Sequence, residues 1–224
     1  MNINELKVGL IGGTGEEGRG LAIRWAMAGA QVTIGSRTVE RAKATADELN
    51  GLVKGGAIRY AGNREAVADS EFVLLTVPFQ HAASTLESHA GDFRPGSLLI
   101  DITVPVAFEK GARYVELPEG SASEHLRARL PESIPLVAAF KTEPAHLLAD
   151  VSARLNCDVF VASDSKEAKA RVTEAIKFIE GLRPVDAGIL YSARAIERMT
   201  VLAIGINRRY KIKTACYRVE GLEL

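Results

Sequence analysis

The residues best suited to chemistry lie near the N-terminus, where an apolar stretch runs into a glycine-rich turn. Residues Lys7–Ile11 predict a buried strand, and Gly13, Gly15 and Gly18 follow it in the pattern Gly-x-Gly-x-x-Gly. A helical pattern at Glu16–Ala28 comes next. In this context the first glycine permits a tight turn, the second lets the backbone approach a pyrophosphate, and the third lets helix and strand pack closely. The sequence therefore predicts a dinucleotide site, with the pyrophosphate at the helix N-terminus.

The end of the second predicted strand indicates which dinucleotide binds. The strand at Gln31–Ile34 is followed by Gly35, Ser36 and Arg37, and Arg41 comes soon after. A site for NAD usually has an acidic residue at this point, which holds the ribose 2′-hydroxyl. Here a hydroxyl and two guanidinium groups replace it, and arginine pairs well with phosphate oxygens. We therefore expect NADP(H) rather than NAD(H).

Three later strand ends carry further candidates for the reactive end of the site. They are Thr76, Val77, Pro78 and His81 after the first of these strands, Val104 and Pro105 after the next, and Lys141 after the third. His81 either packs against the following helix or lies near the nicotinamide. Lys141 either donates a proton or binds an anion at the cleft, or is an ordinary solvated lysine.

Sets of residues typical of other chemistries are missing from the sequence. It contains no recognisable Ser–His–Asp arrangement, no carboxylate pair with clear roles and no metal-ligand cluster. Direct hydride transfer between two bound cofactors depends on positioning and on exclusion of water more than on an acid or a base. We therefore expect no dedicated catalytic residue, with Lys141 and His81 as the weaker alternatives, and no metal.

Strand and helix patterns alternate along the chain, which is typical of α/β proteins. Near-continuous apolar runs such as Leu98–Ile102 indicate strands buried on both faces of a parallel sheet. We predict a Rossmann-like doubly wound parallel sheet over residues 1–188 and a small C-terminal helical segment, residues 189–224, that closes the cleft. Other strands are expected at Ile58–Tyr60, Phe72–Val77, Pro135–Phe140, Asp158–Ala162 and Pro184–Ala187, and other helices at Val39–Asn50, Arg64–Ala68, Gln80–Ala90, Ser123–Arg129, Lys166–Glu180 and Leu190–Asn207.

Composition limits the classes of function. Among 224 residues, 28 are basic (Lys and Arg) and 28 acidic, so the formal net charge is zero and nucleic-acid binding has little electrostatic support. No apolar run reaches the roughly 18 residues of a membrane span, and the N-terminus lacks the features of a signal peptide. The two cysteines are too few for a disulfide framework. We expect a cytoplasmic protein whose partners are small molecules, without nucleic-acid or membrane partners.

The chain also resembles a known family, the NADP(H)-dependent oxidoreductases of the deazaflavin coenzyme F-420 (F420). The resemblance rests on the glycine-rich turn, on Gly35-Ser36-Arg37, on Leu75-Thr76-Val77-Pro78 with His81-Ala82, on Val104-Pro105-Val106 and on the run from Gly181 to Gly188 with Ala193-Arg194 and Glu197 after it. It implies a Rossmann-like enzyme, often a homodimer, in which hydride passes directly between the nicotinamide of NADP(H) and the deazaflavin of coenzyme F-420 as co-substrate.

The resemblance also implies roles for individual residues. Thr14 and Gly15 would contact the pyrophosphate, while Ser36, Arg37 and Arg41 would hold the 2′-phosphate. The nicotinamide side would be lined by Thr76, Val77, Pro78 and His81, and the ring cleft would be shaped by Val104, Pro105 and Leu202.

The chain departs from the family pattern in the segment that borders the deazaflavin. Lys141 stands where members carry His, and Glu143 replaces an apolar residue. Three alternatives therefore stay open: an NADP(H)-dependent reductase of another flavin or of a metal ion, a reductase of a small carbonyl or imine substrate with Lys141 as the proton donor, and a non-catalytic NADP(H) sensor.

Overall fold

A computed structural model describes residues 1–53, 58–109 and 111–222 and is built around one eight-stranded sheet. The strand order is β10-β9-β8-β5-β4-β1-β2-β3. The strands are β1 (Lys7–Ile11), β2 (Gln31–Ser36), β3 (Arg59–Gly62), β4 (Phe72–Leu75), β5 (Leu98–Asp101), β8 (Leu136–Ala138), β9 (Cys157–Ala162) and β10 (Leu182–Gly188). The doubly wound sheet predicted from the sequence is confirmed, with one difference: β9 runs antiparallel to β8. Since β10 is parallel to β9, the last two strands run against the rest.

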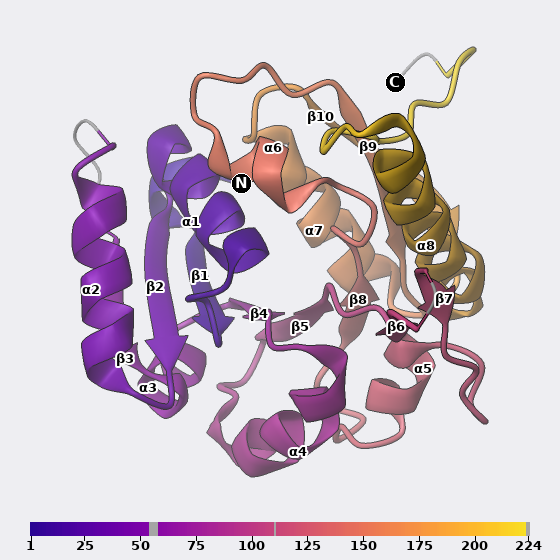
Figure 1. Ribbon diagram of the computed structural model, residues 1–224. Coiled ribbons are helices and arrows are strands. Elements are labelled where there is room, and N and C mark those ends of the chain that lie inside the picture. Colours follow the sequence, from indigo (N-terminus) through magenta and orange to yellow (C-terminus); the bar gives the residue numbers. More distant parts are fainter. Residues whose placement is uncertain (54–57, 110, 223–224) are drawn as a thin grey trace.

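Helices cover both faces of the sheet, as Figure 1 shows. One apolar core lies under α1 (Glu16–Ala28), α2 (Val39–Asn50), α6 (Ala145–Ala149) and α7 (Lys166–Lys177). The other lies under α3 (Asn63–Ala68), α4 (Phe79–His89), α5 (Ala122–Arg127) and the start of α8 (Ala193–Tyr210). The buried side chains of β4 and β5 alternate between the two cores, because successive residues of a strand point to opposite faces. This double burial explains the near-continuous apolar runs in the sequence.

The register of the parallel strands brings several chain segments to one edge of the sheet. Ile11 of β1 is paired with Leu75 of β4, Leu75 with Asp101 of β5, and Asp101 with Ala138 of β8. The segments that follow these strands therefore begin side by side. Every strand-end candidate of the sequence analysis lies in or near these segments.

The helix that follows the glycine-rich turn is fixed firmly to the rest of the molecule. The indole N–H of Trp25 donates a hydrogen bond of 2.9 Å to the carbonyl of Ala175 in α7. Arg24 donates to the carbonyl oxygens of Leu148 and Ala153, at 3.0 and 3.1 Å, around the end of α6. These carbonyls include the acceptors that a helix C-terminus leaves without a partner. The N-terminus of α1 therefore rests on a rigid support.

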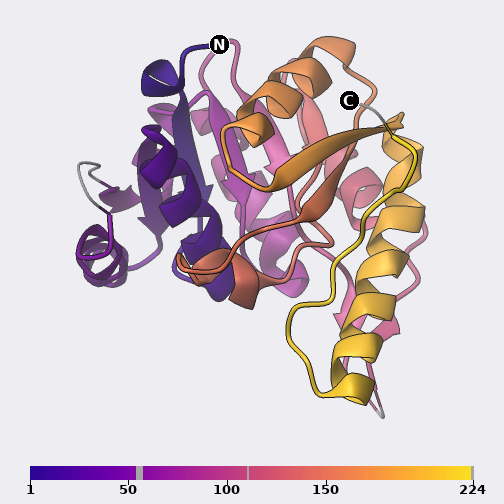
Figure 2. The ribbon, with the colours of Figure 1, turned by 90° about the horizontal axis from the view of Figure 1, so that it is seen from above.

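The C-terminal helix α8 lies apart from the glycine-rich turn, at the opposite end of the sheet (Figure 2). After α8 the chain turns back toward β9 and β10, where the backbone N–H of Asp158 donates to the carbonyl of Tyr217 at 2.9 Å. Arg183 and Asp158 form an ion pair of 2.7 Å beneath this returning segment. Within the described ranges, no helix combines the length and the apolar character needed to span a bilayer.

Four short elements were not predicted. They are α6, the two-residue strands β6 (Val106–Ala107) and β7 (Arg113–Tyr114), which pair with each other, and a 3₁₀ turn at Ile3–Glu5. Elements of two to five residues show too little periodicity to be recognised in a sequence. β6 and α6 nevertheless border the functional site, so part of its wall was not predicted.

Candidate functional site

The smaller of two cavities lies at the carboxyl ends of β1, β2 and β4, and we call it the small pocket. Its volume is about 170 Å³. Ser36 is buried there and accepts a hydrogen bond of 3.1 Å from the backbone N–H of Thr38, whereas the side chains of Arg37 and Arg41 are exposed. The structure thus brings together the three residues predicted to hold a 2′-phosphate. The other lining residues are Gly12, Thr14, Gly15, Thr38, Asn63, Thr76, Val77, Pro78, His81 and Thr85.

The glycine-rich turn leaves room where a pyrophosphate would lie. A Cβ atom added at Gly15 would meet no atom within 4 Å, and no side chain caps the N-terminus of α1 at this residue. A Cβ at Gly18 would lie 2.9 Å from Cα of Gly13, so α1 and the turn are in direct contact. The positive φ of the turn, 74°, belongs to Gly12 rather than to Gly13, to which the sequence analysis assigned the turn. The open N-terminus of α1 suits a phosphate group.

His81 lies in the first turn of α4, with its backbone N–H donating to the carbonyl of Pro78 at 2.8 Å. Its side chain is exposed and lines the small pocket together with Arg37. It is not part of the lining of the larger cavity. This position favours a role beside the 2′-phosphate over a role beside the nicotinamide.

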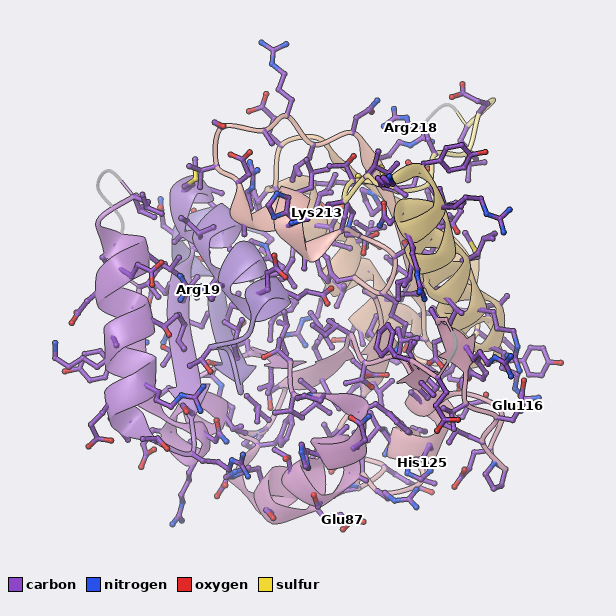
Figure 3. All side chains as sticks on the ribbon, in the orientation of Figure 1. Arg19, Glu87, Glu116, His125, Lys213 and Arg218 are labelled. Carbon is purple, nitrogen blue, oxygen red and sulfur yellow. The ribbon has the colours of Figure 1, made fainter. Side chains whose placement is uncertain are left out.

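The larger cavity has a volume of about 690 Å³ and adjoins the small pocket, and we call it the large cleft. The two cavities share Gly15, Thr76, Val77 and Pro78. The large cleft continues past these residues to the segments after β5 and β8, to α8 and to the returning C-terminal segment. Lys213 lies at its mouth between α6 and α8 (Figure 3). A cavity of this size holds a large ring system.

Two residues predicted to shape the large cleft do not line it. The side chain of Leu202 is 57% exposed on another side of α8, and Pro105 is buried beside β7, where its carbonyl accepts the N–H of Val115. Helical periodicity turns other residues of α8 to the cleft, and β6 brings in Phe108, whose side chain is 72% exposed. The lining from these segments consists of Ile102, Thr103, Val104, Val106, Phe108, Thr200, Ala203, Ile204 and Asn207. Val104 is thus placed as predicted.

Lys141 is buried in a cluster of charged groups rather than solvated. Its ammonium group donates to Oδ2 of Asp101 at 2.8 Å and to the carbonyl of Thr103 at 2.5 Å, and it lies 3.2 Å from Oε1 of Glu197. Burial opposes its positive charge, but the two carboxylates outweigh burial and raise the pKa of Lys141 above its ordinary value. All three ammonium protons have acceptors, so none is left for a substrate.

The backbone before Lys141 is strained, and the strain directs two side chains to opposite sides. Phe140 has a φ of 52°, a left-handed conformation that costs about 1–2 kcal/mol for a residue with a side chain. Its ring packs against Trp25 with a centroid separation of 5.3 Å. The next residue, Lys141, then points into the charged cluster, and its carbonyl accepts the hydroxyl of Thr200 at 2.7 Å. The ammonium group and the backbone carbonyl of Lys141 thus both contact α8 and hold it at the cleft.

Two acidic side chains lie beside the large cleft without a cation of their own: Glu143 is buried, and Glu17 is half-buried with its Oε1 atom shielded from solvent. Glu143 accepts hydrogen bonds from the hydroxyl and the N–H of Thr142, at 3.0 and 3.3 Å. Burial raises the pKa of Glu143 to about 7. Burial, followed by the nearby charge of Glu143, also raises the pKa of Glu17 in the first turn of α1 well above its ordinary value. The carboxyl group of Glu143 is therefore protonated in slightly acidic solution.

Some of these site residues had no recognisable signal in the sequence. Asn63 accepts the N–H of Gly12 at 3.2 Å, and the carboxylate of Glu197 accepts the N–H of Ala122 at 2.9 Å. These contacts join positions 51 and 75 residues apart. Only the run of residues that resembles the family drew attention to Glu197. In the described part of the chain, no group of three or more His, Cys, Asp or Glu side chains could hold a metal ion.

The sequence matches a family model and, over nearly its full length, relatives that share one name. The family model described as NADP oxidoreductase coenzyme F420-dependent matches residues 7–105. The F420-dependent NADP reductase of Methanothermobacter marburgensis is 36% identical over 223 residues, which cover 97% of this chain and 99% of the relative. The protein of the same name from Methanocaldococcus jannaschii is 32% identical over 226 residues, which cover 98% of this chain and all of the relative.

A solved structure shows that the fold is shared as well. The crystal structure of a candidate F420-dependent NADP reductase from Arthrobacter sp. FB24 superposes with a TM-score of 0.81. The superposition covers 96% of this chain and 99% of that chain, at 22% sequence identity. At this identity the likeness establishes the fold and the order of its elements.

The first prediction concerns the choice of dinucleotide. Arg37→Ala removes one charge-assisted contact to a 2′-phosphate, which contributes about 1.5–3 kcal/mol. We expect the Kd for NADPH to rise about 10- to 100-fold and the Kd for NADH to change little. Titration of both cofactors by calorimetry measures the two effects. Arg64→Ala, at an exposed arginine of α3 paired with Asp92, serves as the control. Equal losses for both cofactors in Arg37→Ala would contradict the assignment.

The second prediction concerns the charged cluster. Lys141→Met leaves Asp101 and Glu197 buried without their cation, which costs about 3–5 kcal/mol of the free energy of unfolding. In the control Lys177→Met, loss of an exposed pair with Glu174 costs at most about 1 kcal/mol. Urea unfolding measures both. A Lys141→Met protein of normal stability but without activity would instead support Lys141 as a proton donor.

The third prediction concerns the pH dependence of stability. The ordinary pKa of a glutamate, 4.5, is raised to about 7 for Glu143 in the folded protein. Between these values the folded state binds more protons than the unfolded state, so the free energy of unfolding falls as the pH rises. As the pH rises from 4.5 to 7, we expect the free energy of unfolding of Glu143→Gln to increase by about 3 kcal/mol relative to that of wild type. Urea unfolding at pH 5 and pH 8 tests this, and parallel changes in both proteins would refute it.

Proposed function

The chain belongs to the family of coenzyme F420-dependent NADP oxidoreductases, and on this premise we propose that it transfers a hydride directly between NADP(H) and the deazaflavin ring of coenzyme F420. The observation that carries the proposal is the pair of adjoining cavities. The small pocket presents Ser36, Arg37 and Arg41, and the large cleft is big enough for the nicotinamide and a second ring. Both open at the carboxyl ends of the strands, where such folds bind their ligands.

Each part of the two cavities has a proposed role. The N-terminus of α1, with Thr14 and Gly15, would hold the pyrophosphate. Val77 and Val104 would pack against the rings and exclude water from them. When bound, the nicotinamide supplies or takes up the hydride and the deazaflavin ring is its partner. Positioning of the two rings then accounts for most of the catalysis.

The charged cluster supports direct transfer over reduction of a carbonyl or imine substrate. That alternative depended on Lys141 as a proton donor. The ammonium protons of Lys141 are directed at Asp101, Thr103 and Glu197 instead. We infer that Lys141 positions the segment after β8 and α8 around the rings and transfers no proton.

We further propose that residues 189–224 close the large cleft and take part in a homodimer. α8 contributes Thr200 and Asn207 to the cleft, while Leu202 and Tyr210 are exposed apolar side chains on the same helix. Exposed apolar side chains on a helix are typical of a subunit interface. Cys157 and Cys216 are free thiols, which agrees with the proposed location in the cytoplasm.

The direct test mixes the purified protein with NADPH and oxidised coenzyme F420 and follows the loss of the deazaflavin absorbance. We expect rapid bleaching with NADPH and slow bleaching with NADH. FMN in place of coenzyme F420 is the control for the acceptor. Tight binding of NADPH without bleaching of coenzyme F420 would contradict the proposal, and the acceptor would then have to be sought elsewhere.

A further inference from the structure

Two carboxyl groups at the large cleft lie outside the small pocket proposed for the 2′-phosphate. Glu17 comes from the first turn of α1, and Glu143 from the segment between β8 and α6. Both line the large cleft, and neither lines the small pocket. Since Arg37 and Ser36 mark the small pocket as the end for the 2′-phosphate, these carboxyl groups lie toward the end where the rings would meet.

The hydrogen bonds made to Glu17 and Glu143 leave room for a proton on each carboxyl group. In the described part of the chain, Oε1 of Glu17 is buried and has no hydrogen-bond partner. The side chain of Glu143 receives hydrogen bonds from its neighbour Thr142. The nearby cation, Lys141, is held by Asp101 and Glu197. An ionised carboxylate that is buried without a cation is costly, so a proton on the oxygen is the favourable alternative.

Several titratable groups surround the two carboxyl groups. Glu16 and the positive charge of Lys141 act on Glu17, in opposite directions. Cys216 of the returning C-terminal segment faces Glu143, and Cys157 of β9 lies beside Cys216. Burial is the largest cause for both glutamates, and the charge of Glu143 raises the pKa of Glu17 further. Burial thus disfavours the charged form of both carboxyl groups.

We propose that Glu143 is the proton donor that accompanies hydride transfer, with Glu17 at the same cleft as a positioning residue. This inference rests on the proposed function, since a deazaflavin ring reduced by a hydride must also gain one proton. The O–H bond of Glu143 breaks as an N–H bond forms on the ring. The electron pair arrives with the hydride from NADPH, which is oxidised to NADP⁺. Water returns a proton to Glu143 after each turnover, and in the reverse direction Glu143 accepts the proton.

The position and acidity of Glu143 suit this task. A general acid works best when its pKa lies near the pH of operation, and the pKa of Glu143 is about 7. Its carboxyl group lines the cleft, whereas Lys141 has no free proton and His81 lies at the small pocket. His146 of α6 also lines the large cleft, where it lies 3.6 Å from the carboxylate of Glu16. Glu143 is thus a buried titratable group of the large cleft whose pKa suits neutral pH.

The kinetic test compares wild type, Glu143→Gln and Glu143→Asp, with Glu174→Gln on the surface of α7 as the control. The rate of deazaflavin reduction by NADPH is measured from pH 5.5 to 8.5, in water and in deuterium oxide. We expect the wild-type rate to fall above about pH 7, and Glu143→Gln to be about 100-fold slower at pH 6 with a flat profile. Glu143→Asp, which retains a carboxyl group, should recover part of the rate and a pH dependence. The KM for NADPH should not change.

A second measurement uses the free protein and needs no activity. Infrared spectroscopy of the wild type should show a protonated-carboxyl band at pH 6 that is lost near pH 7. This transition should be absent from Glu143→Gln and present in Glu174→Gln. Absence of the transition from the wild type would overturn the proposal, because Glu143 would then hold no proton to donate.

The outcomes separate this inference from the proposed function. A wild-type rate and pH profile in Glu143→Gln, with normal bleaching of coenzyme F420, would overturn the proton-donor role alone. A wild-type protein that bleaches no coenzyme F420 would overturn the proposed function and this role with it. A flat, slowed profile in Glu143→Gln together with the lost infrared transition supports the role.

Discussion

The large cleft depends on one buried ion cluster. Lys141 joins the end of β5, through Asp101, to α8, through Glu197. The hydroxyl of Ser123 also donates to Asp101 at 2.6 Å, which attaches the start of α5 to the same cluster. Four segments of the chain are thereby joined, and three of them, α8 and the segments after β5 and β8, line the large cleft. Because removal of one partner from a buried ion pair leaves an uncompensated charge, such a cluster maintains one arrangement of these segments and disfavours others.

The sequence predicted the nucleotide end of the site far better than the reactive end. Residues of the small pocket follow β1, β2 and β4 directly, so short-range patterns of strand, turn and helix place Thr14, Ser36 and Arg37. The large cleft is built by contacts over long separations. Lys141 and Asp101 are 40 residues apart, and Tyr114 donates to Glu197, 83 residues away, at 2.8 Å. No local pattern contains that information.

The errors in the prediction have the same physical origin. The helix at Leu190–Asn207 was expected, and the structure has α8 at Ala193–Tyr210, but the pattern of apolar residues did not tell which face meets the cleft. α8 carries apolar side chains on more than one side, since Ala203 is buried and Leu202 is exposed. A helix that packs against different surroundings on different sides does not show a single apolar stripe. Tertiary packing, decided in part by Glu197, therefore determines its rotation.

Glu17 meets two opposing effects at the phosphate end of α1. An ionised carboxylate in the first turn gains about 0.3–1 kcal/mol from the helix dipole. Burial of its carboxyl group, whose Oε1 has no hydrogen-bond partner in the described part of the chain, raises the pKa of Glu17 and opposes the charged form. Burial thereby weakens the repulsion between Glu17 and a pyrophosphate at the positive end of α1. Glu16, its neighbour, is exposed, where solvent screens its charge. The two acidic residues of this turn thus differ in their surroundings, because burial disfavours the charge of Glu17 and solvent screens the charge of Glu16.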